Sequence, residues 1–504
     1  MERRTTRMGW LVMAVALTAG MVACSKVDNT IDEPATPETP KAYTLTVTAT
    51  KGEDEATRAL SLNGKTLNAT WAEGDAVQVY HVSNPGTPLE MESTTPDGTL
   101  YALRGGATTT LSGTITGDYT PAAGDVLRLR FLPYPNYTTQ EGTLDYIAAH
   151  CDQASATITV ASVNAGTGDV TSLALAEFQN QQAIVKFSLK RQDGTTPVEA
   201  SNLTVKVGNE TYNVTLATPA SDIFVAIKNV SNKAVSLTAN GPSGLFTYDK
   251  NSVSFEKGNY YAVGVKMTKQ PSLGDIYFSD GTCSETLEAG KNPIGVIAYL
   301  GTDAFSENGT EIDGMPFTGH GLVLCLRNAA SGTAGNWSTE EVLKFDGGLV
   351  RSVDDLKRTT NVSGYTNTAM LTVDSNKYPA AASARNYTEL PAPEGTTGWF
   401  LPSAQQWVKM LEGLGGLDES AIVWNAYFDV DFDAIYEWES ALLKAGPDNY
   451  DSMTGSSLKY QSSSEYSIDA NVCLYVSPDQ GIGFSSVNKC GENSVMRVRP
   501  VLAF

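Results

Sequence analysis

Strict alternation of apolar and polar side chains marks the first strand of the folded chain. Residues 43–50 read Tyr-Thr-Leu-Thr-Val-Thr-Ala-Thr. The odd-numbered, mostly apolar side chains share one face and the Thr side chains share the other, which predicts a β-strand with one buried face. Polar residues 51–58 follow and predict a turn.

Short strands separated by turn residues continue to about residue 270. One group ends near residue 170, and a second runs from Phe178 to Met267. Their even spacing predicts a mainly β protein with two packed β-sandwiches, over residues 43–170 and 171–270. We expect the two to join in the polar, Gly-rich stretch near residues 165–180.

The remainder of the chain, residues 271–504, mixes helices and strands. Ser403 and Gln406 have the spacing of a capping box and predict a helix over residues 404–414. Its apolar stripe at i, i+3, i+4 and i+7 consists of Trp407, Met410, Leu411 and Leu414. We expect a second helix over residues 433–445 and strands over residues 471–476, 482–487 and 495–501, which makes this an α+β domain.

Composition narrows the range of partners. The 504 residues are 41% hydrophobic, enough for folded cores, and carry a formal net charge of −21. Such an acidic chain is a poor match for nucleic acid, because binding to phosphates needs a basic face. No nucleic-acid partner is therefore expected.

The N-terminal segment has the layout of an export signal. Three Arg within residues 1–7 precede an apolar stretch over residues 8–23, which is short for a membrane-spanning helix. It ends in Met21-Val22-Ala23-Cys24, which resembles a bacterial lipobox. The resemblance implies that residues 1–23 are removed and that Cys24 carries the lipid that anchors the protein to a membrane. An ordinary signal with an incidental Cys is the alternative.

A tether follows the lipobox. Residues 24–42 are acidic and carry Pro34, Pro37 and Pro40, a period of three that favours an extended, stiff conformation. A lipid followed by such a spacer would hold the folded domains away from a membrane surface.

Three short motifs resemble the fimbrillin family, the surface lipoproteins and pilins of Gram-negative gut and oral anaerobes. They are Thr57-Arg58-Ala59, Trp71-Ala72-Glu73-Gly74-Asp75 and Lys257-Gly258-Asn259-Tyr260-Tyr261. The resemblance covers roughly residues 43–269. It implies a pair of transthyretin-like β-sandwiches and a place in a fimbrium.

The same resemblance implies an assembly mechanism. Fimbrillin-type pilins are exported as lipoproteins and cut after an Arg by a trypsin-like protease, and the first strand then leaves a groove that another subunit's strand fills. Arg58 and Ala59 are the candidate processing site in this sequence. An ordinary loop arginine is the alternative for Arg58.

Two further blocks resemble bacterial domains related to the C-type-lectin-like fold, of the Fibrobacter-type major paralogous kind. They are Gly398-Trp399-Phe400-Leu401-Pro402-Ser403 and Tyr460-Gln461-Ser462-Ser463-Ser464-Glu465, followed by the closing Val498-Arg499-Pro500. The Glu-Pro-Asn and Trp-Asn-Asp tripeptides of sugar-binding lectins do not occur in the chain. The resemblance therefore implies a fold over residues 271–504 and no particular ligand.

The sequence supplies little catalytic chemistry. It has three His and no metalloprotease, nucleophile-elbow or phosphate-loop motif. His150 and Cys151 are neighbours and would point apart on a strand, and the acidic loop of Asp303, Glu307, Glu311 and Asp313 lacks EF-hand spacing. We expect no enzyme activity, no cofactor and no metal site.

Five cysteines remain after Cys24. Cys473 and Cys490 lie on strands expected to be neighbours, so one disulfide between them is a candidate in an oxidising export route. A bridge between Cys283 and Cys325 is a weaker candidate. Free buried thiols are the alternative throughout.

Two functions remain open. One is a fimbrial subunit at the cell surface, a tip adhesin with other fimbrial subunits as partners and a C-terminal binding domain. The other is an outer-membrane lipoprotein that binds glycan or protein without polymerising. The closing residues 495–504 look interior to the last domain, so we expect the chain to accept a strand and to donate none.

Overall fold

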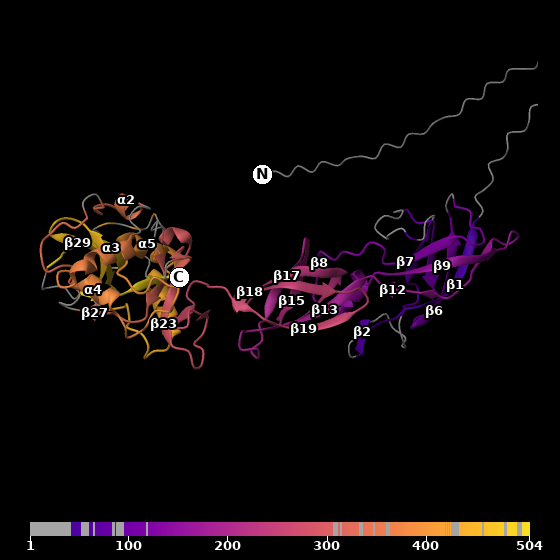
Figure 1. Cartoon of the computed structure of the whole chain (residues 1–504), viewed down its shortest axis with the longest axis horizontal. Helices are drawn as coiled ribbons and strands as arrows, with labels where there is room; N and C mark the ends of the chain where they lie inside the picture. Colours follow the sequence, from indigo (N-terminus) through magenta and orange to yellow (C-terminus); the bar gives the residue numbers. More distant parts are fainter. Residues whose placement is uncertain are drawn as a thin grey trace, which may run out of the picture.

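A computed structural model describes the chain from residue 42 onward, and three β-rich bodies follow one another in chain order (Figure 1). Within residues 42–504 the described ranges exclude 52–59, 64–65, 83–85, 87–94, 117–118, 306–310, 313–314, 332–335, 346–347, 359–362, 419, 421, 423, 425–432, 456–457, 478–480 and 491–495. Among the described residues, no helix is both long and apolar enough to cross a membrane. The expected signal peptide, Cys24 and the tether lie outside the described residues.

The first body is built on one sheet that closes on itself. Its strands follow the order β10-β1-β6-β5-β4-β7-β9-β12, β11 pairs with β1, and β10 also pairs with β9. These strands are β1 (Tyr43–Thr50), β4 (Ala76–His81), β5 (Gly98–Ala102), β6 (Thr108–Ile115), β7 (Val126–Phe131), β9 (Ala154–Val163), β10 (Asp169–Ser172), β11 (Ala176–Glu177) and β12 (Gln179–Asn180). The two walls of this body are thus continuous parts of a single sheet. A separate hairpin is formed by β2 (Leu60–Asn63) and β3 (Thr66–Ala69).

The second body consists of two sheets around one core. One sheet has the order β16-β13-β19 and the other the order β20-β18-β17-β14-β15-β8. The strands are β8 (Thr139–Gln140), β13 (Gln182–Lys190), β14 (Ala200–Val207), β15 (Glu210–Ala220), β16 (Asp222–Lys228), β17 (Val230–Gly241), β18 (Gly244–Phe255), β19 (Tyr260–Lys266) and β20 (Thr268–Lys269). This is the two-layer arrangement expected for a β-sandwich.

The join between these bodies differs from the expected boundary at residue 170. Strands β10 to β12 pair in the first sheet, so that sheet extends to Asn180. In the other direction, β8 pairs with β15, and helix α1 (Leu144–His150) places Ile147 in the core of the second body. Both differences arise from pairing between strands far apart in the sequence, which strand spacing does not encode.

The third body packs helices against two five-stranded sheets. The sheets have the orders β22-β21-β23-β26-β32 and β27-β31-β28-β29-β30. Their strands are β21 (Ile276–Phe278), β22 (Cys283–Ser284), β23 (Pro293–Leu300), β26 (Gly321–Cys325), β27 (Ala330–Ser331), β28 (Leu458–Glu465), β29 (Ala470–Ser477), β30 (Gly481–Asn488), β31 (Met496–Val498) and β32 (Val501–Ala503). The remaining elements are the hairpin β24 (Glu311–Ile312) and β25 (Met315–Pro316), the helices α2 (Val353–Leu356), α3 (Gly364–Leu371), α4 (Pro379–Arg385), α5 (Ala404–Gly413) and α6 (Asp433–Leu443), and the 3₁₀ turns η2 (Thr302–Ala304) and η5 (Thr372–Asp374).

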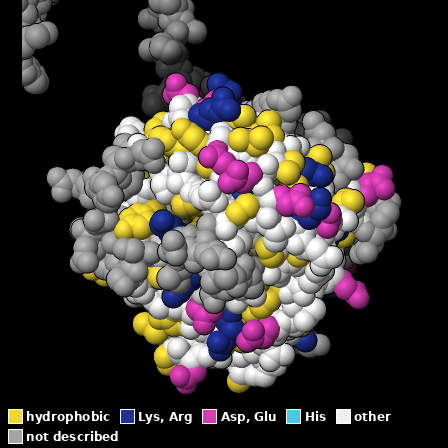
Figure 2. Space-filling model, turned by 90° about the vertical axis from the view of Figure 1, so that its left-hand side faces the viewer, with side chains coloured by type: hydrophobic (Ala, Val, Ile, Leu, Met, Phe, Trp, Pro, Cys, Tyr) yellow, Lys and Arg dark blue, Asp and Glu magenta, His cyan; other side chains and the backbone are white. Residues whose placement is uncertain are grey.

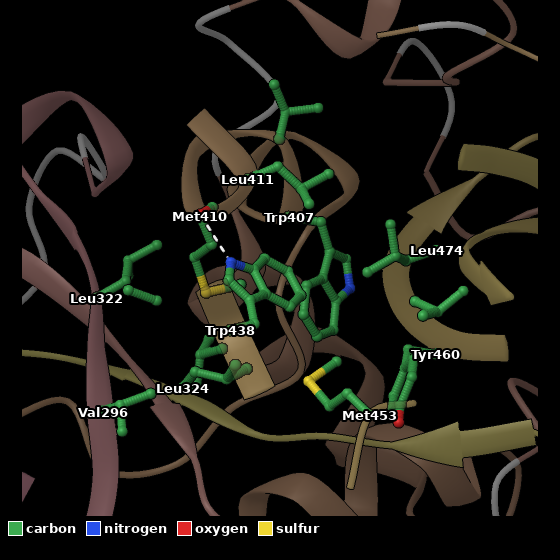
Figure 3. Packing of buried hydrophobic residues seen from close by; sticks show 14 of the residues in the cluster. Val296, Leu322, Leu324, Trp407, Met410, Leu411, Trp438, Met453, Tyr460 and Leu474 are labelled. Atoms are coloured by element: carbon green, nitrogen blue, oxygen red, sulfur yellow. Dashed lines mark hydrogen bonds between the residues drawn. The ribbon is translucent and has the colours of Figure 1, made fainter. Parts of the chain in front are cut away.

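Helix α5 confirms the predicted capping box. The Ser403 side chain accepts a hydrogen bond from the Gln406 backbone N–H, and the Gln406 side chain accepts one from the Ser403 N–H. The expected apolar stripe faces the core, where Trp407 packs near Trp438 of α6 with ring centroids 6.0 Å apart (Figure 3). The indole N–H of Trp438 donates to the Met410 carbonyl, so the stripe also fixes how α5 and α6 meet.

The five described cysteines are all free thiols. The Cys473–Cys490 disulfide expected from the sequence is therefore not formed in the structure. Strands β29 and β30 form a hairpin whose register places Cys473 opposite Ser485, five residues short of Cys490. The Cys473 thiol lies 3.3 Å from the Ser485 hydroxyl. Neighbouring strands were predicted correctly, but hairpin register decides which side chains meet. Cys283 and Cys325 are likewise unbridged.

Candidate functional site

Strand β1 lies in the interior of the first sheet. It pairs antiparallel with β6 along its whole length, from Tyr43 opposite Ile115 to Thr50 opposite Thr108. Its other edge pairs in parallel with β10 and then with β11. Both edges of the strand are thus occupied, and its absence would expose the backbone hydrogen-bonding groups of three strands.

The alternation predicted for β1 is confirmed. Leu45, Val47 and Ala49 are at most 3% exposed, whereas the Thr side chains between them face outward. The buried side chains enter the core of the first body, where Trp71 makes edge-on contacts with Phe131 and Phe178. Burial of a Leu or Val side chain contributes about 1.5–3 kcal/mol, so β1 contributes strongly to this core.

A buried ion pair follows directly after β1. Lys51 Nζ lies 2.5 Å from Asp152 Oδ2, and the side chains are 1% and 4% exposed. The ammonium group also lies 3.6 Å from the centroid of the Phe131 ring. The second carboxylate oxygen of Asp152 accepts a hydrogen bond from Gln182 Nε2 at 3.1 Å. Since Gln182 begins β13, the pair connects the end of β1 to the join between the first two bodies.

The sequence interpretation missed this pair by treating Lys51 as part of a polar turn. A signal was present, because Lys51 continues the odd-numbered face of the strand. Its backbone N–H also extends the ladder by donating to the Ala107 carbonyl at 2.9 Å. A charged residue in phase with a buried face is a sign of a buried partner.

Arg58 and Ala59, the expected processing site, lie outside the described residues. They belong to the segment that connects β1 to β2, because β1 ends at Thr50 and β2 begins at Leu60. The only covalent link from β1 toward the rest of the first sheet therefore passes through Arg58.

The closing strands β31 and β32 are built into the third body. Strand β32 pairs with β26, and β31 pairs with β27 and β28. Arg499 between them is fully buried, and its guanidinium donates to the carbonyls of Cys325, Leu326 and Asp451. The closing segment thus lies inside the third body, as the sequence predicted.

Ion pairs join the second and third bodies. Arg191, which follows β13, pairs with Glu285 and lies 3.6 Å from Glu288. Lys269 pairs with Asp275 at 2.6 Å, and these side chains are 7% and 4% exposed. These contacts therefore connect the end of the second body with the beginning of the third.

The candidate dyad of His150 and Cys151 is not assembled. His150 Nδ1 lies 3.1 Å from the Tyr146 carbonyl and its ring stacks on Tyr146, while the Cys151 thiol faces the Asn136 carbonyl. Burial raises the pKa of Cys151 to about 12, with the neighbouring Asp152 charge adding to the shift. That thiol is a poor nucleophile, because the thiolate is the reactive form.

The acidic loop considered for calcium is described only in part. Asp303 accepts a hydrogen bond from the Tyr299 hydroxyl at 2.7 Å and lies 3.2 Å from Lys409. Glu307 and Asp313 fall outside the described residues. Among the residues that are described, no cluster of three or more His, Cys, Asp or Glu has the arrangement of a metal site.

The end of the molecule formed by the third body has a mixed surface. Among its described residues, hydrophobic, acidic and basic side chains are interspersed over the face in view (Figure 2). No single sign of charge dominates there, so charge gives no indication of a ligand class.

No protein-family model matches the chain, and neither does any curated protein. The solved structures similar to it include a fimbrial protein from Bacteroides ovatus, with 16% identity, a TM-score of 0.31 and coverage of 89% of this chain and 100% of that one. A putative cell adhesion protein from Bacteroides uniformis has 13% identity, a TM-score of 0.27 and coverage of 44% and 93%. The tip fimbrial protein Mfa3 from Porphyromonas gingivalis has 12% identity, a TM-score of 0.23 and coverage of 46% and 96%. At this level of similarity, an assignment of function has to rest on the residues of the chain itself.

Proposed function

We propose that this protein is a surface-exposed fimbrial subunit that accepts a strand from another subunit in the place of β1. Cleavage after Arg58 separates β1 covalently from the sheet and allows the exchange. The observation that carries the proposal is the position of β1, an interior strand whose covalent connection to the sheet passes through one candidate cleavage site.

The geometry of β1 supports this kind of assembly. An extended segment that replaces it gains main-chain hydrogen bonds to β6 on one edge and to β10 and β11 on the other. It also fills the core positions of Leu45, Val47 and Ala49 with its own alternate side chains. The backbone contacts supply affinity, and the buried positions supply specificity.

The closing strands support a position at the filament tip. Met496–Val498 and Val501–Ala503 are sheet members, and Arg499 binds three carbonyls inside the third body. Releasing this segment as a donor strand would remove one of the two partners of β26 and take the Arg499 guanidinium away from the carbonyls that it binds. A subunit that accepts a strand and donates none ends a filament, with its third body outermost.

The third body would then be the binding module. It is an α+β unit, and in this proposal it binds a host or bacterial surface ligand, a glycan or a protein. We propose no catalytic role for it.

Before assembly the protein is held at the outer membrane by lipid on Cys24. Each buried CH₂ contributes about 0.8 kcal/mol, so more than one acyl chain gives durable anchoring. The acidic Pro-containing tether spaces β1 and Arg58 from the surface, where a protease has access.

The test mixes the cleaved, lipid-free protein with a stalk subunit that carries an unpaired C-terminal strand. A stable one-to-one complex is expected by gel filtration, and Arg58→Ala, which prevents cleavage, should abolish it, whereas Lys257→Ala in the second body should not. Absence of a complex with cleaved protein would instead favour a non-polymerising surface lipoprotein. Self-assembly of cleaved protein into filaments would contradict the tip position.

A further inference from the structure

The place vacated by β1 would contain a buried acidic side chain. Asp152 is 3% exposed, and its contacts are Lys51 on one oxygen and the Gln182 amide on the other. Lys51 precedes Arg58, so it leaves together with β1. Asp152 would then keep a neutral amide and lose its cation, which is a costly arrangement for a buried carboxylate.

The position of the cation relative to β1 is defined. Lys51 lies on the same face as Leu45, Val47 and Ala49, two residues beyond Ala49. Its backbone N–H donates to the carbonyl of Ala107, the residue before β6, and so continues the pairing of β1 with β6. An incoming strand that runs in the direction of β1 presents a side chain to Asp152 when it also has the register of β1. A shift by one residue would turn every side chain to the opposite face.

We propose that Asp152 selects the incoming strand: the partner segment carries apolar side chains at alternate positions and a Lys two residues after the last of them. This inference rests on the strand exchange proposed above and names the chemistry of the partner. The carboxylate acts as a positioning residue that sets direction and register, while the apolar positions provide most of the contact area.

Two labelled peptides of equal charge test the selection. One has the sequence of residues 42–52, and the other carries Tyr43→Lys and Lys51→Met, which moves the cation to the opposite end. Equal charge matters because the protein itself is strongly acidic, with a formal net charge of −21, and would attract any cationic peptide. The acceptor is the full chain with Cys24→Ser, cut after Arg58, and the readout is the equilibrium Kd by fluorescence anisotropy.

The peptide with Lys at position 51 is expected to bind about 100-fold more tightly, the effect of leaving a buried charge without its partner. In an Asp152→Asn acceptor the difference should fall below about tenfold. Asp169→Asn is the matched control, because Asp169 lies beside β1 in β10 but is exposed, and it should leave the 100-fold preference unchanged. The comparison of peptides on the unsubstituted acceptor does not depend on whether Asp152→Asn folds.

The outcomes separate the two proposals. Equal affinity of both peptides for the unsubstituted acceptor would overturn the role of Asp152 and leave strand exchange standing. Failure of both peptides to bind would contradict strand exchange, and the inference about Asp152 with it.

Discussion

Lys489 and Glu465 form an ion pair 2.5 Å apart in which both side chains are fully buried. The Glu465 carboxylate also accepts hydrogen bonds from the backbone N–H groups of Lys344 and Phe345. Lys489 lies over the Trp337 ring, 4.6 Å from its centroid. The pair therefore connects a loop without regular structure, which contains Val342, Lys344 and Phe345, to the residue that follows β30.

Lys489→Met should destabilise the third body by about 3–5 kcal/mol, because the Glu465 carboxyl group would remain buried without its cationic partner. Chemical denaturation followed by Trp fluorescence measures this change. Lys377→Met is the matched control, since Lys377 pairs with Glu340 at the surface, with side chains 45% and 47% exposed, and its loss should cost at most about 1 kcal/mol. Equal effects of the two substitutions would contradict the structural role given to Lys489.

Leu45→Ala should destabilise the first body by about 2–5 kcal/mol, since Leu45 is fully buried on β1. Thr46→Ala, on the outward face of the same strand, should change stability by no more than about 0.5 kcal/mol. Thermal unfolding of the uncut chain compares the two variants. If both behave alike, β1 is not packed in the core as described.

The thiols should be slow to alkylate in the native protein. Burial raises the pKa of Cys325 and of Cys283 to about 12, with the Asp275 charge adding to the shift at Cys283. At pH 8 little thiolate is present, and the rate at Cys283 should rise about tenfold per pH unit as the pH increases toward that pKa. Mass spectrometry of a Cys24→Ser chain should count five reactive thiols after unfolding without reductant. A Cys473–Cys490 bridged peptide would contradict the hairpin register.

Arg191→Met should loosen the attachment of the third body, because it removes the contacts with both Glu285 and Glu288. Small-angle scattering is expected to show a broader distribution of distances between the second and third bodies, with each body still folded. Lys228→Met removes an exposed pair with Glu210 within the second body and should leave the distribution unchanged. If the distance distribution of Arg191→Met is unaltered, the contacts of Arg191 do not hold the third body in place.

Local features of the fold could be predicted from the sequence, because they depend on neighbours in the chain. The capping box of Ser403 and Gln406 and the alternation of residues 43–50 are of this kind. Features that depend on long-range pairing could not. The closure of the first sheet through β9 and β10, the assignment of β8 to the second body and the register opposite Cys473 each require a partner that the local sequence does not name.

The candidate site likewise has one part that the sequence predicts and one part that only the fold reveals. Strand β1 was predicted from its own pattern, whereas Asp152 lies about 100 residues beyond Lys51 and follows a helix that packs in another body. A lysine in phase with a buried face predicts that an anionic partner exists, and only the folded arrangement identifies it.

The most direct test of the account is the N-terminal mass of the protein in fibres sheared from the cell surface. If β1 is exchanged after processing, the polypeptide begins at Ala59, no peptide from residues 43–58 is recovered with it, and a strand from another subunit is cross-linked to β6. Recovery of the chain beginning at lipid-bearing Cys24, with residues 43–50 still in place, would contradict the proposed assembly.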